Sequence, residues 1–168
     1  GLIQLAEYDV SVYDARHKKV PVDLQSPVGA PWFARLMKYI NEATRIKGGD
    51  VDAANHLQEW LVNHGAFENV HYRDVWLPVV PGDHHLYHES VYTRLRDDVM
   101  VSSSMPCHLR LICSDLGPLQ TGARSAKPLL LGTGILDEAT FDLLEANVER
   151  EINESSTVFY TRLQCIYA

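Results

Sequence analysis

The chain has 168 residues, 46% hydrophobic and 22% charged, which is enough apolar material for one globular domain and too little for a second full one. Its formal net charge of −7 argues against a nucleic-acid partner, because phosphate binding needs clustered lysine and arginine. The three cysteines fit no disulfide framework, and no apolar run reaches the roughly 18 to 20 residues of a membrane span. We therefore expect a cytoplasmic protein with a small-molecule partner and no membrane partner.

The first predicted element is a strand over residues 2–8. These residues are mostly apolar and compatible with β-structure, as in a strand that is buried on both faces. The polar and aromatic run Glu7–Asp9 predicts the end of this strand and the start of an irregular loop that continues through Pro27.

Two amphipathic helices are predicted next. The first begins at Pro31 and ends at Gly48, and its apolar residues recur at helical spacing: Trp32, Leu36, Ile40 and Ala43. The second begins near residues 50–52 and ends at Gly65, with Ala53, Leu57, Trp60 and Leu61 on one face. Residues from Val70 to Trp76 then alternate between apolar and polar, which predicts a half-exposed strand before Pro78. A connection carrying two helices suits a pair of parallel strands, so the pattern indicates an α/β sheet.

The remaining residues divide into a less periodic segment and a regular end. Residues 82–136 predict an insertion with helical pieces near 85–95 and 106–116 and a loop near 117–125. Asp137 is a predicted N-cap for a helix with an apolar stripe of Phe141, Leu144, Val148 and Ile152. Val158–Tyr167 predicts a final strand.

Four segments resemble one protein family: GLIQLAEYD (1–9), LVNHGAFENVHYRDVWLPV (61–79), FDLLEANVEREI (141–152) and FYTRLQCIYA (159–168). They are similar to the carboxyl-terminal half of fungal class I S-adenosylmethionine (SAM)-dependent methyltransferases of secondary metabolism. The resemblance implies strands five, six and seven of a Rossmann-like sheet with flanking helices, strand seven lying antiparallel between the other two. Residues 1–81 and 137–168 would form this partial α/β domain, and 82–136 a mainly helical insertion or substrate cap.

The same resemblance implies SAM as the cofactor of the complete family. In that family a glycine-rich turn follows the first strand, and an acidic residue after the second strand binds the ribose. The candidate in this chain, Gly132-Thr133-Gly134, lacks a third glycine and a following strand with an acidic residue, so a turn between helices is favoured. We expect the cofactor half to lie elsewhere in the parent chain or on a partner, and this chain alone not to bind SAM. No cofactor-binding residue is assigned.

Candidate site residues follow the two predicted strand ends, because ligands of open α/β sheets bind beyond the carboxyl ends of parallel strands. Glu7 is a candidate catalytic proton acceptor, and Asp9 a candidate hydrogen-bond acceptor for substrate. Tyr8, Trp32 and Trp76 could wall an aromatic or polyketide-like ligand. The structural alternative is that Glu7 is a solvated loop acid and Trp32 anchors the core.

A second group of candidates is the histidine-rich run after Pro81. If this run is helical, His84 and His88 share one face at the spacing of a metal-binding pair, but a third ligand is not identifiable and no metal site is predicted. Either histidine could act as the general base that deprotonates a substrate hydroxyl, and His85 could contact substrate. A solvated helix start is the structural alternative.

Three functions remain open at this point. The first is the substrate-binding portion of a SAM-dependent small-molecule methyltransferase. The second is a SAM-independent cyclase or pericyclase on the same scaffold, which needs only a shaped pocket and a few hydrogen bonds. The third is a non-catalytic interaction module whose sheet edge pairs with a second chain or a second copy of itself.

Overall fold

A computed structural model describes residues 2–79, 119–154 and 156–168 of the chain. In these residues the elements follow in the order β1 (Gln4–Tyr13), α1 (Trp32–Ile46), α2 (Ala53–His64), β2 (His71–Val79), α5 (Leu119–Gly132), α6 (Glu138–Glu154) and β3 (Phe159–Tyr167). The predicted α/β class is confirmed. The histidine-rich run at 84–88 and the predicted helical pieces at 85–95 and 106–116 lie outside the described residues, and the predicted domain boundaries stay a prediction.

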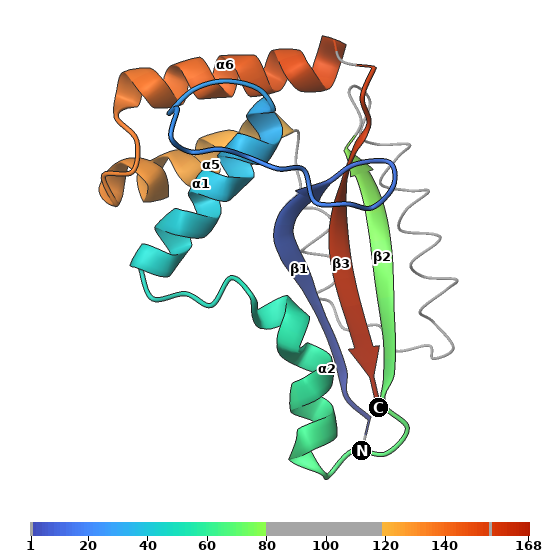
Figure 1. Cartoon of the computed structure of the whole chain (residues 1–168). Coiled ribbons are helices and arrows are strands. Elements are labelled where there is room, and N and C mark those ends of the chain that lie inside the picture. Colours follow the sequence, from blue (N-terminus) through green and yellow to red (C-terminus); the bar gives the residue numbers. More distant parts are fainter. Residues whose placement is uncertain (1, 80–118, 155) are drawn as a thin grey trace.

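The strands form a three-stranded sheet in the order β1-β3-β2, with β3 antiparallel to both neighbours. β1 and β2 therefore run in the same direction and are separated by the last strand of the chain (Figure 1). This is the strand order that the resemblance implies. The two ends of the chain lie together at one end of the sheet, where Ile3 and Ala168 exchange backbone hydrogen bonds of 2.9 and 3.1 Å.

Both early strands run further than the sequence predicts. β1 does not end at Glu7–Asp9 but continues to Tyr13, with a register irregularity between Asp9 and Tyr13. The prediction was wrong because a polar residue can stay within a strand when a neighbouring strand supplies a partner for its side chain. Here Arg162 of β3 donates a hydrogen bond to Asp9. β2 likewise continues through Pro78, which lies opposite Tyr160. Proline lacks the N–H that a second neighbouring strand would need, so it suits a strand that pairs on one side.

The ends of α1 and α2 are confirmed. Gly48 (φ 82°) follows the C-cap residue Lys47 of α1, and Gly65 (φ 70°) is the left-handed residue that ends α2. Such backbone angles are strained for residues with a Cβ atom, which is why glycine stands at these two positions. One detail was wrong: Trp60 is 50% exposed rather than part of the buried face of α2.

Helices α1, α5 and α6 pack together at the carboxyl ends of β1 and β2 (Figure 1). Their contact is the main apolar core, hereafter the helical core, and its buried residues include Leu36, Ala43, Leu130, Phe141, Leu144 and Val148. The predicted stripe of α6 is confirmed as buried, and Asp137 accepts a hydrogen bond from the N–H of Thr140 at 2.7 Å, as an N-cap does. The loop predicted over 117–125 was wrong for residues 119–125, which belong to α5.

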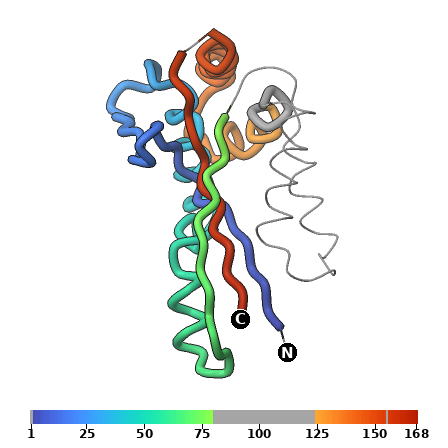
Figure 2. The backbone as a smooth tube through the Cα atoms, turned by 90° about the vertical axis from the view of Figure 1, so that its right-hand side faces the viewer, coloured from blue at the N-terminus to red at the C-terminus, as the bar shows by residue number. Residues whose placement is uncertain are grey.

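Two smaller apolar clusters lie along the sheet. On one face, Leu57 and Leu61 of α2 pack against Ile166 of β3, so α2 covers this face (Figure 2). On the opposite face, Leu77, Leu163 and Cys165 form a second cluster. The alternation of side chains along each strand therefore divides the sheet into a face under α2 and an apolar second face.

The long connection between β1 and α1 is held by side chains of α1. The buried guanidinium group of Arg35 donates hydrogen bonds to the carbonyl oxygens of Gly29 (2.6 Å), Asp23 (2.8 Å) and Ser26 (2.5 Å). The hydroxyl of Tyr39 donates to the carbonyl oxygen of Pro27 at 2.8 Å. Four carbonyl groups of an irregular loop are thereby satisfied, and the loop has a defined path over α1.

Candidate functional site

The face of the sheet under α2 carries a polar cluster near the carboxyl ends of β1 and β2. The strand register places Asp9 of β1, Arg162 of β3 and Trp76 of β2 in one row across the sheet, and Glu7, Gln164 and Asp74 in the next row on the same face. We call the following residues the Arg162 cluster: Asp9, Tyr13, Asn55, Asp74, Trp76 and Arg162. Two predicted site residues, Asp9 and Trp76, are therefore brought to one place, although the strands that carry them are not direct neighbours.

Arg162 is the centre of this cluster. Its Nη2 atom lies 2.5 Å from Oδ2 of Asp9 and 2.5 Å from Oδ1 of Asn55 at the start of α2, and its Nη1 atom lies 3.7 Å from Oδ2 of Asp74. The side chains of Arg162 and Asp9 are only 17% and 3% exposed. One guanidinium group thus joins both outer strands and α2 through charge-assisted hydrogen bonds and ion pairs.

Aromatic rings surround the guanidinium group. The Arg162 Cζ atom lies 5.6 Å from the ring centroid of Tyr13 and 5.9 Å from that of Trp76, which are cation–π distances. The rings of Tyr13 and Trp76 meet edge to face at 4.9 Å. His17, from the loop after β1, stacks on Trp76 with a centroid distance of 4.0 Å and an interplanar angle of 4°. One face of the Trp76 ring is therefore covered by the protein itself.

The same cluster holds the loop after β1 against the sheet. Besides the stack of His17 on Trp76, Lys19 forms an isolated bridge with Tyr13, and its ammonium group lies 3.9 Å from the Asp9 carboxylate. The side chain of Asp14 accepts hydrogen bonds from the backbone N–H groups of Arg16 (2.8 Å) and Lys18 (2.9 Å), which closes the turn.

The acid–base properties of the cluster follow from burial and hydrogen bonding. Burial opposes ionisation of Asp9, but hydrogen bonds from Tyr13, Ser11 and Arg162 outweigh it, so the pKa of Asp9 lies below its ordinary value of 3.8. Burial and the hydrogen bond to Asp9 raise the pKa of Tyr13, and burial and the hydrogen bond to Asp74 raise the pKa of Tyr72 to about 12. None of these three groups changes charge near neutral pH, so they are suited to holding charges in place rather than to exchanging protons with a substrate.

The other predicted site residues are separated from Asp9 and Trp76. Glu7 lies on the same face and is exposed, with its carboxylate accepting the backbone N–H of Tyr8 at 3.0 Å. Tyr8 itself contributes to the cluster on the opposite face of the sheet, against Leu77, Leu163 and Cys165. His84, His85 and His88 lie outside the described residues, so their predicted roles, like that of Glu7, stay predictions.

Trp32 belongs to the helical core rather than to the sheet face. Its side chain packs against the core, and its backbone N–H and that of Phe33 donate to the two carboxylate oxygens of Glu151 at 3.0 and 2.7 Å. A carboxylate at the first turn of a helix satisfies N–H groups that lack an intrahelical partner. Glu151 of α6 thus caps α1, and this position of Trp32 agrees with the structural alternative given above.

Five residues of the site were not found from the sequence: Tyr13, His17, Asn55, Asp74 and Arg162. One signal was available for Arg162, because a charged residue inside a predicted central strand must find a buried partner. No local pattern indicated the other four, since their contacts depend on the strand register and on where α2 lies.

The described residues offer little for a cofactor or a metal. Leu129–Gly132 is helical, so Gly132-Thr133-Gly134 joins two helices and does not follow a strand. Within 2–79, 119–154 and 156–168, no group of three or more histidine, cysteine, aspartate or glutamate residues is arranged to hold a metal ion. In the same part of the chain no helix has the length and apolar character to cross a bilayer.

Comparisons with known proteins give one relationship. No family model matches the chain, and no solved structure matches it. The chain is 39% identical, over all of its 168 residues, to the secondary metabolism regulator laeA of Coprinopsis cinerea, and it spans 36% of the length of that protein. The chain is thus related over its whole length to part of a fungal secondary-metabolism protein, as the sequence resemblance indicated.

Proposed function

We propose that this chain is the substrate-binding portion of a SAM-dependent methyltransferase-like protein of fungal secondary metabolism, acting on a small molecule. The observation that carries the proposal is the 39% identity over the whole chain to a secondary metabolism regulator. The sheet order β1-β3-β2, with the last strand antiparallel between two strands of like direction, supports it, because the methyltransferase resemblance implies that order.

In this proposal the chain positions substrate and does not hold the cofactor. The Gly132-Thr133-Gly134 turn does not fit SAM, because it joins two helices, whereas the glycine-rich turn that binds the cofactor in the family follows a strand. The Arg162 cluster fixes the carboxyl ends of β1 and β2, where ligands of such sheets bind. Its role is to hold this edge and the loop carrying His17 in one arrangement.

A segment exchange tests the proposal in a living system. The matching segment of the Coprinopsis cinerea relative is replaced by this chain, and the chimera is expressed in a strain that lacks the relative. We expect the chimera to restore the secondary-metabolite profile, while a deletion of the same segment does not. A chimera that is folded and as abundant as the relative, but leaves the profile unrestored, would overturn the proposal.

The cofactor part is tested separately by isothermal titration of SAM into the isolated chain. We expect no saturable heat. Binding in the micromolar range would place a SAM site within this chain. It would contradict the proposal that the chain positions substrate and does not hold the cofactor. The other two predicted functions have their own readouts: turnover of a polyene substrate that ignores SAM would favour the cyclase, and a dimer in light scattering would favour the interaction module.

A further inference from the structure

The connection between β1 and α1 carries an exposed serine that is followed by proline. Ser26-Pro27 is the one Ser-Pro or Thr-Pro dipeptide in the 168 residues of the chain. Gln25, Ser26 and Pro27 are all exposed, and they belong to no helix or strand. Proline-directed protein kinases phosphorylate serine or threonine that is followed by proline, and such a site has to reach the kinase as an accessible, irregular segment. The segment 25–27 has both properties.

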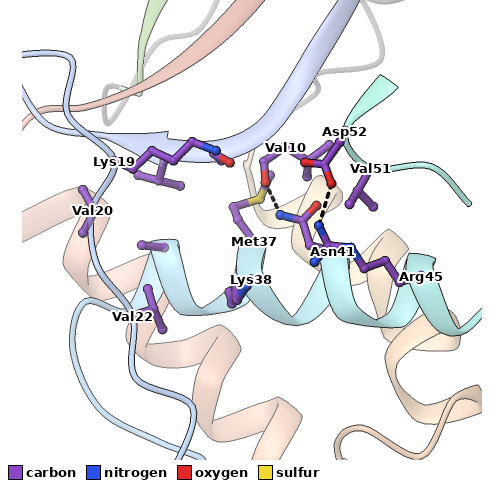
Figure 3. A pocket seen from close by; sticks show the side chains of 13 residues that line it. Val10, Lys19, Val20, Val22, Met37, Lys38, Asn41, Arg45, Val51 and Asp52 are labelled. Carbon is purple, nitrogen blue, oxygen red and sulfur yellow. Dashed lines mark hydrogen bonds and ion pairs between the residues drawn. The ribbon is translucent and has the colours of Figure 1, made fainter. Parts of the chain in front are cut away.

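The residues before this segment hold it at the surface of α1. Val20, Val22 and Leu24 pack against the helical core, so the loop is anchored up to Leu24. Figure 3 shows Val20 and Val22 beside α1, where they help to line a small cavity between the loop, β1 and this helix. The Ser26 hydroxyl group donates a hydrogen bond of 2.7 Å to the carbonyl oxygen of Val28, within its own loop. The serine is therefore presented at the surface, next to an anchored stretch of chain.

A buried arginine lies next to this serine. Arg35 is only 4% exposed, and its guanidinium group donates to the carbonyl oxygens of Asp23, Ser26 and Gly29. All three acceptors are neutral, and no carboxylate of the described residues forms an ion pair with Arg35. In the same part of the chain its Nη2 atom makes no hydrogen bond. A buried charge without a counter-ion is unfavourable, so this position favours an anion.

The geometry brings an anion on the Ser26 side chain within reach of this guanidinium group. The Nη1 atom of Arg35 lies 2.5 Å from the carbonyl oxygen of Ser26 itself, and only a few covalent bonds separate that oxygen from the serine hydroxyl. A phosphate group lengthens the side chain and adds strong acceptor oxygens, which suit the free Nη2 donors. The carboxylate of Asp23 accepts the N–H of Gln25 at 2.8 Å and is exposed, so water and salt screen its repulsion of a phosphate.

We propose that Ser26 is a phosphorylation site for a proline-directed protein kinase, and that its phosphate pairs with the buried guanidinium group of Arg35. In the reaction the Ser26 Oγ atom forms a bond to the γ-phosphorus of ATP, the bond from that phosphorus to the oxygen of the leaving ADP breaks, and the hydroxyl proton passes to the kinase. The phosphate ties the loop that carries His17 more firmly to α1. The proposal does not depend on methyl transfer or on a small-molecule substrate, so its failure would leave the function proposed above untouched.

Phosphorylation in vitro tests the site. The full chain is incubated with a purified mitogen-activated protein kinase, ATP and Mg²⁺, and the modified residue is located by mass spectrometry. We expect a single phosphate on Ser26, none in Ser26→Ala, and a rate about tenfold lower in Pro27→Ala, which keeps the acceptor but removes the residue that the kinase selects. Ser156→Ala is the matched control, since Ser156 is exposed but followed by threonine, and it should be modified like the original chain. No phosphate on Ser26, or equal rates in the original chain and Pro27→Ala, would overturn the proposal.

A pH titration followed by phosphorus-31 NMR tests the pairing with Arg35. The second pKa of a free phosphoserine is about 6. A guanidinium group beside the phosphate stabilises the dianion, so we expect this pKa to be about one unit lower in the folded, phosphorylated chain than in a phosphorylated peptide of residues 20–32. An equal or higher pKa in the folded chain would overturn the pairing.

Two arginine variants of the phosphorylated chain identify the partner of the phosphate. Arg35→Met should return the phosphate pKa to the value in the peptide. Arg45→Met is the matched control at the far end of α1, where Arg45 lies 2.9 Å from Asp52, and it should keep the lowered pKa. Because Arg35 also holds the loop, circular dichroism checks that Arg35→Met is folded, and the comparison of the original chain with the peptide decides the case if it is not. The same lowered pKa in a folded Arg35→Met would contradict the assignment.

Discussion

The helical core and the Arg162 cluster are stabilised in different ways. The helical core joins three helices through apolar side chains such as Leu130, Phe141 and Leu144, each of them fully buried. The Arg162 cluster joins three strands and one helix through buried charges, with carboxylates on two strands meeting one guanidinium group. Loss of an apolar side chain leaves a cavity, whereas loss of one charge leaves its partner uncompensated in a buried place. The two regions should therefore respond differently to substitution and to pH.

The largest effect is expected in the helical core. Phe141→Ala should lower the free energy of unfolding by about 3 to 5 kcal/mol, because the ring is fully buried between α6 and its neighbours and the space cannot close completely. Urea denaturation followed by circular dichroism measures the change. Leu143→Ala is the control on the same helix, since Leu143 is 48% exposed. Similar losses in both variants would show that α6 does not bury the face described.

A slightly smaller effect is expected for Arg162→Met. This change leaves Asp9 buried without its guanidinium partner, and we expect a loss of about 3 kcal/mol in the same assay. The exposed loop residue Arg16 gives the control, Arg16→Met, which should be nearly neutral. Adding Asp9→Asn to Arg162→Met should recover part of the loss, because it removes the uncompensated charge. A double variant as unstable as the sum of the single variants would show that the two groups do not interact.

The difference between the two regions also explains which features could be predicted from the sequence. Two of the three helices of the helical core follow from spacing within a single segment: Trp32, Leu36 and Ile40 predicted α1, and Asp137 and Phe141 predicted the start of α6. The third helix, α5, was not predicted, and a loop was expected over part of it. Gly48 and Gly65 were sufficient to predict where α1 and α2 end. These features depend on local backbone geometry, which a short stretch of sequence determines.

The polar cluster could not be predicted in the same way. The polar run Glu7–Asp9 was interpreted as the end of β1 because no nearby residue could pair with a buried Asp9. Its partner, Arg162, stands 153 positions later in the chain. The side on which Tyr8 lies, and the row that joins Asp9 to Trp76, follow only from the pairing of each strand with β3. A shift of one residue in this register would exchange the two faces. Contacts of this kind depend on tertiary structure and carry no local signal.

Glu151 provides an intermediate case, since it is a charged residue within the helical core. We expect Glu151→Ala to lower the free energy of unfolding by about 1 to 2 kcal/mol, because the N–H groups of Trp32 and Phe33 lose their acceptors. Glu151→Gln keeps one acceptor oxygen and should fall between the alanine variant and the original. The control is Glu154→Ala, an exposed residue at the end of the same helix. An unchanged stability in Glu151→Ala would contradict the tertiary cap.

The smallest expected effect is the pH dependence that Asp9 gives to the Arg162 cluster. Hydrogen bonds from Tyr13, Ser11 and Arg162 lower the pKa of Asp9 in the folded chain, although burial opposes ionisation and offsets part of their effect. A carboxyl group with a lowered folded pKa stabilises the fold above its unfolded pKa of 3.8 and loses this contribution as pH falls below that value. The apolar contacts of the helical core carry no such dependence.

Urea unfolding between about pH 6 and about pH 3 measures this contribution, with Asp9→Asn as the reference that cannot ionise at this position. The difference in unfolding free energy between the original chain and Asp9→Asn should be constant above about pH 5 and shrink below the ordinary aspartate pKa. Asp14 and Asp137 also have lowered pKa values, because backbone N–H groups donate to them, but they are present in both proteins and cancel. A difference that is independent of pH would mean that Asp9 stabilises the sheet through its shape and hydrogen bonds alone. The ion pair with Arg162 would then contribute nothing to stability, and the contrast between the two regions would reduce to the kind of side chain that each one buries.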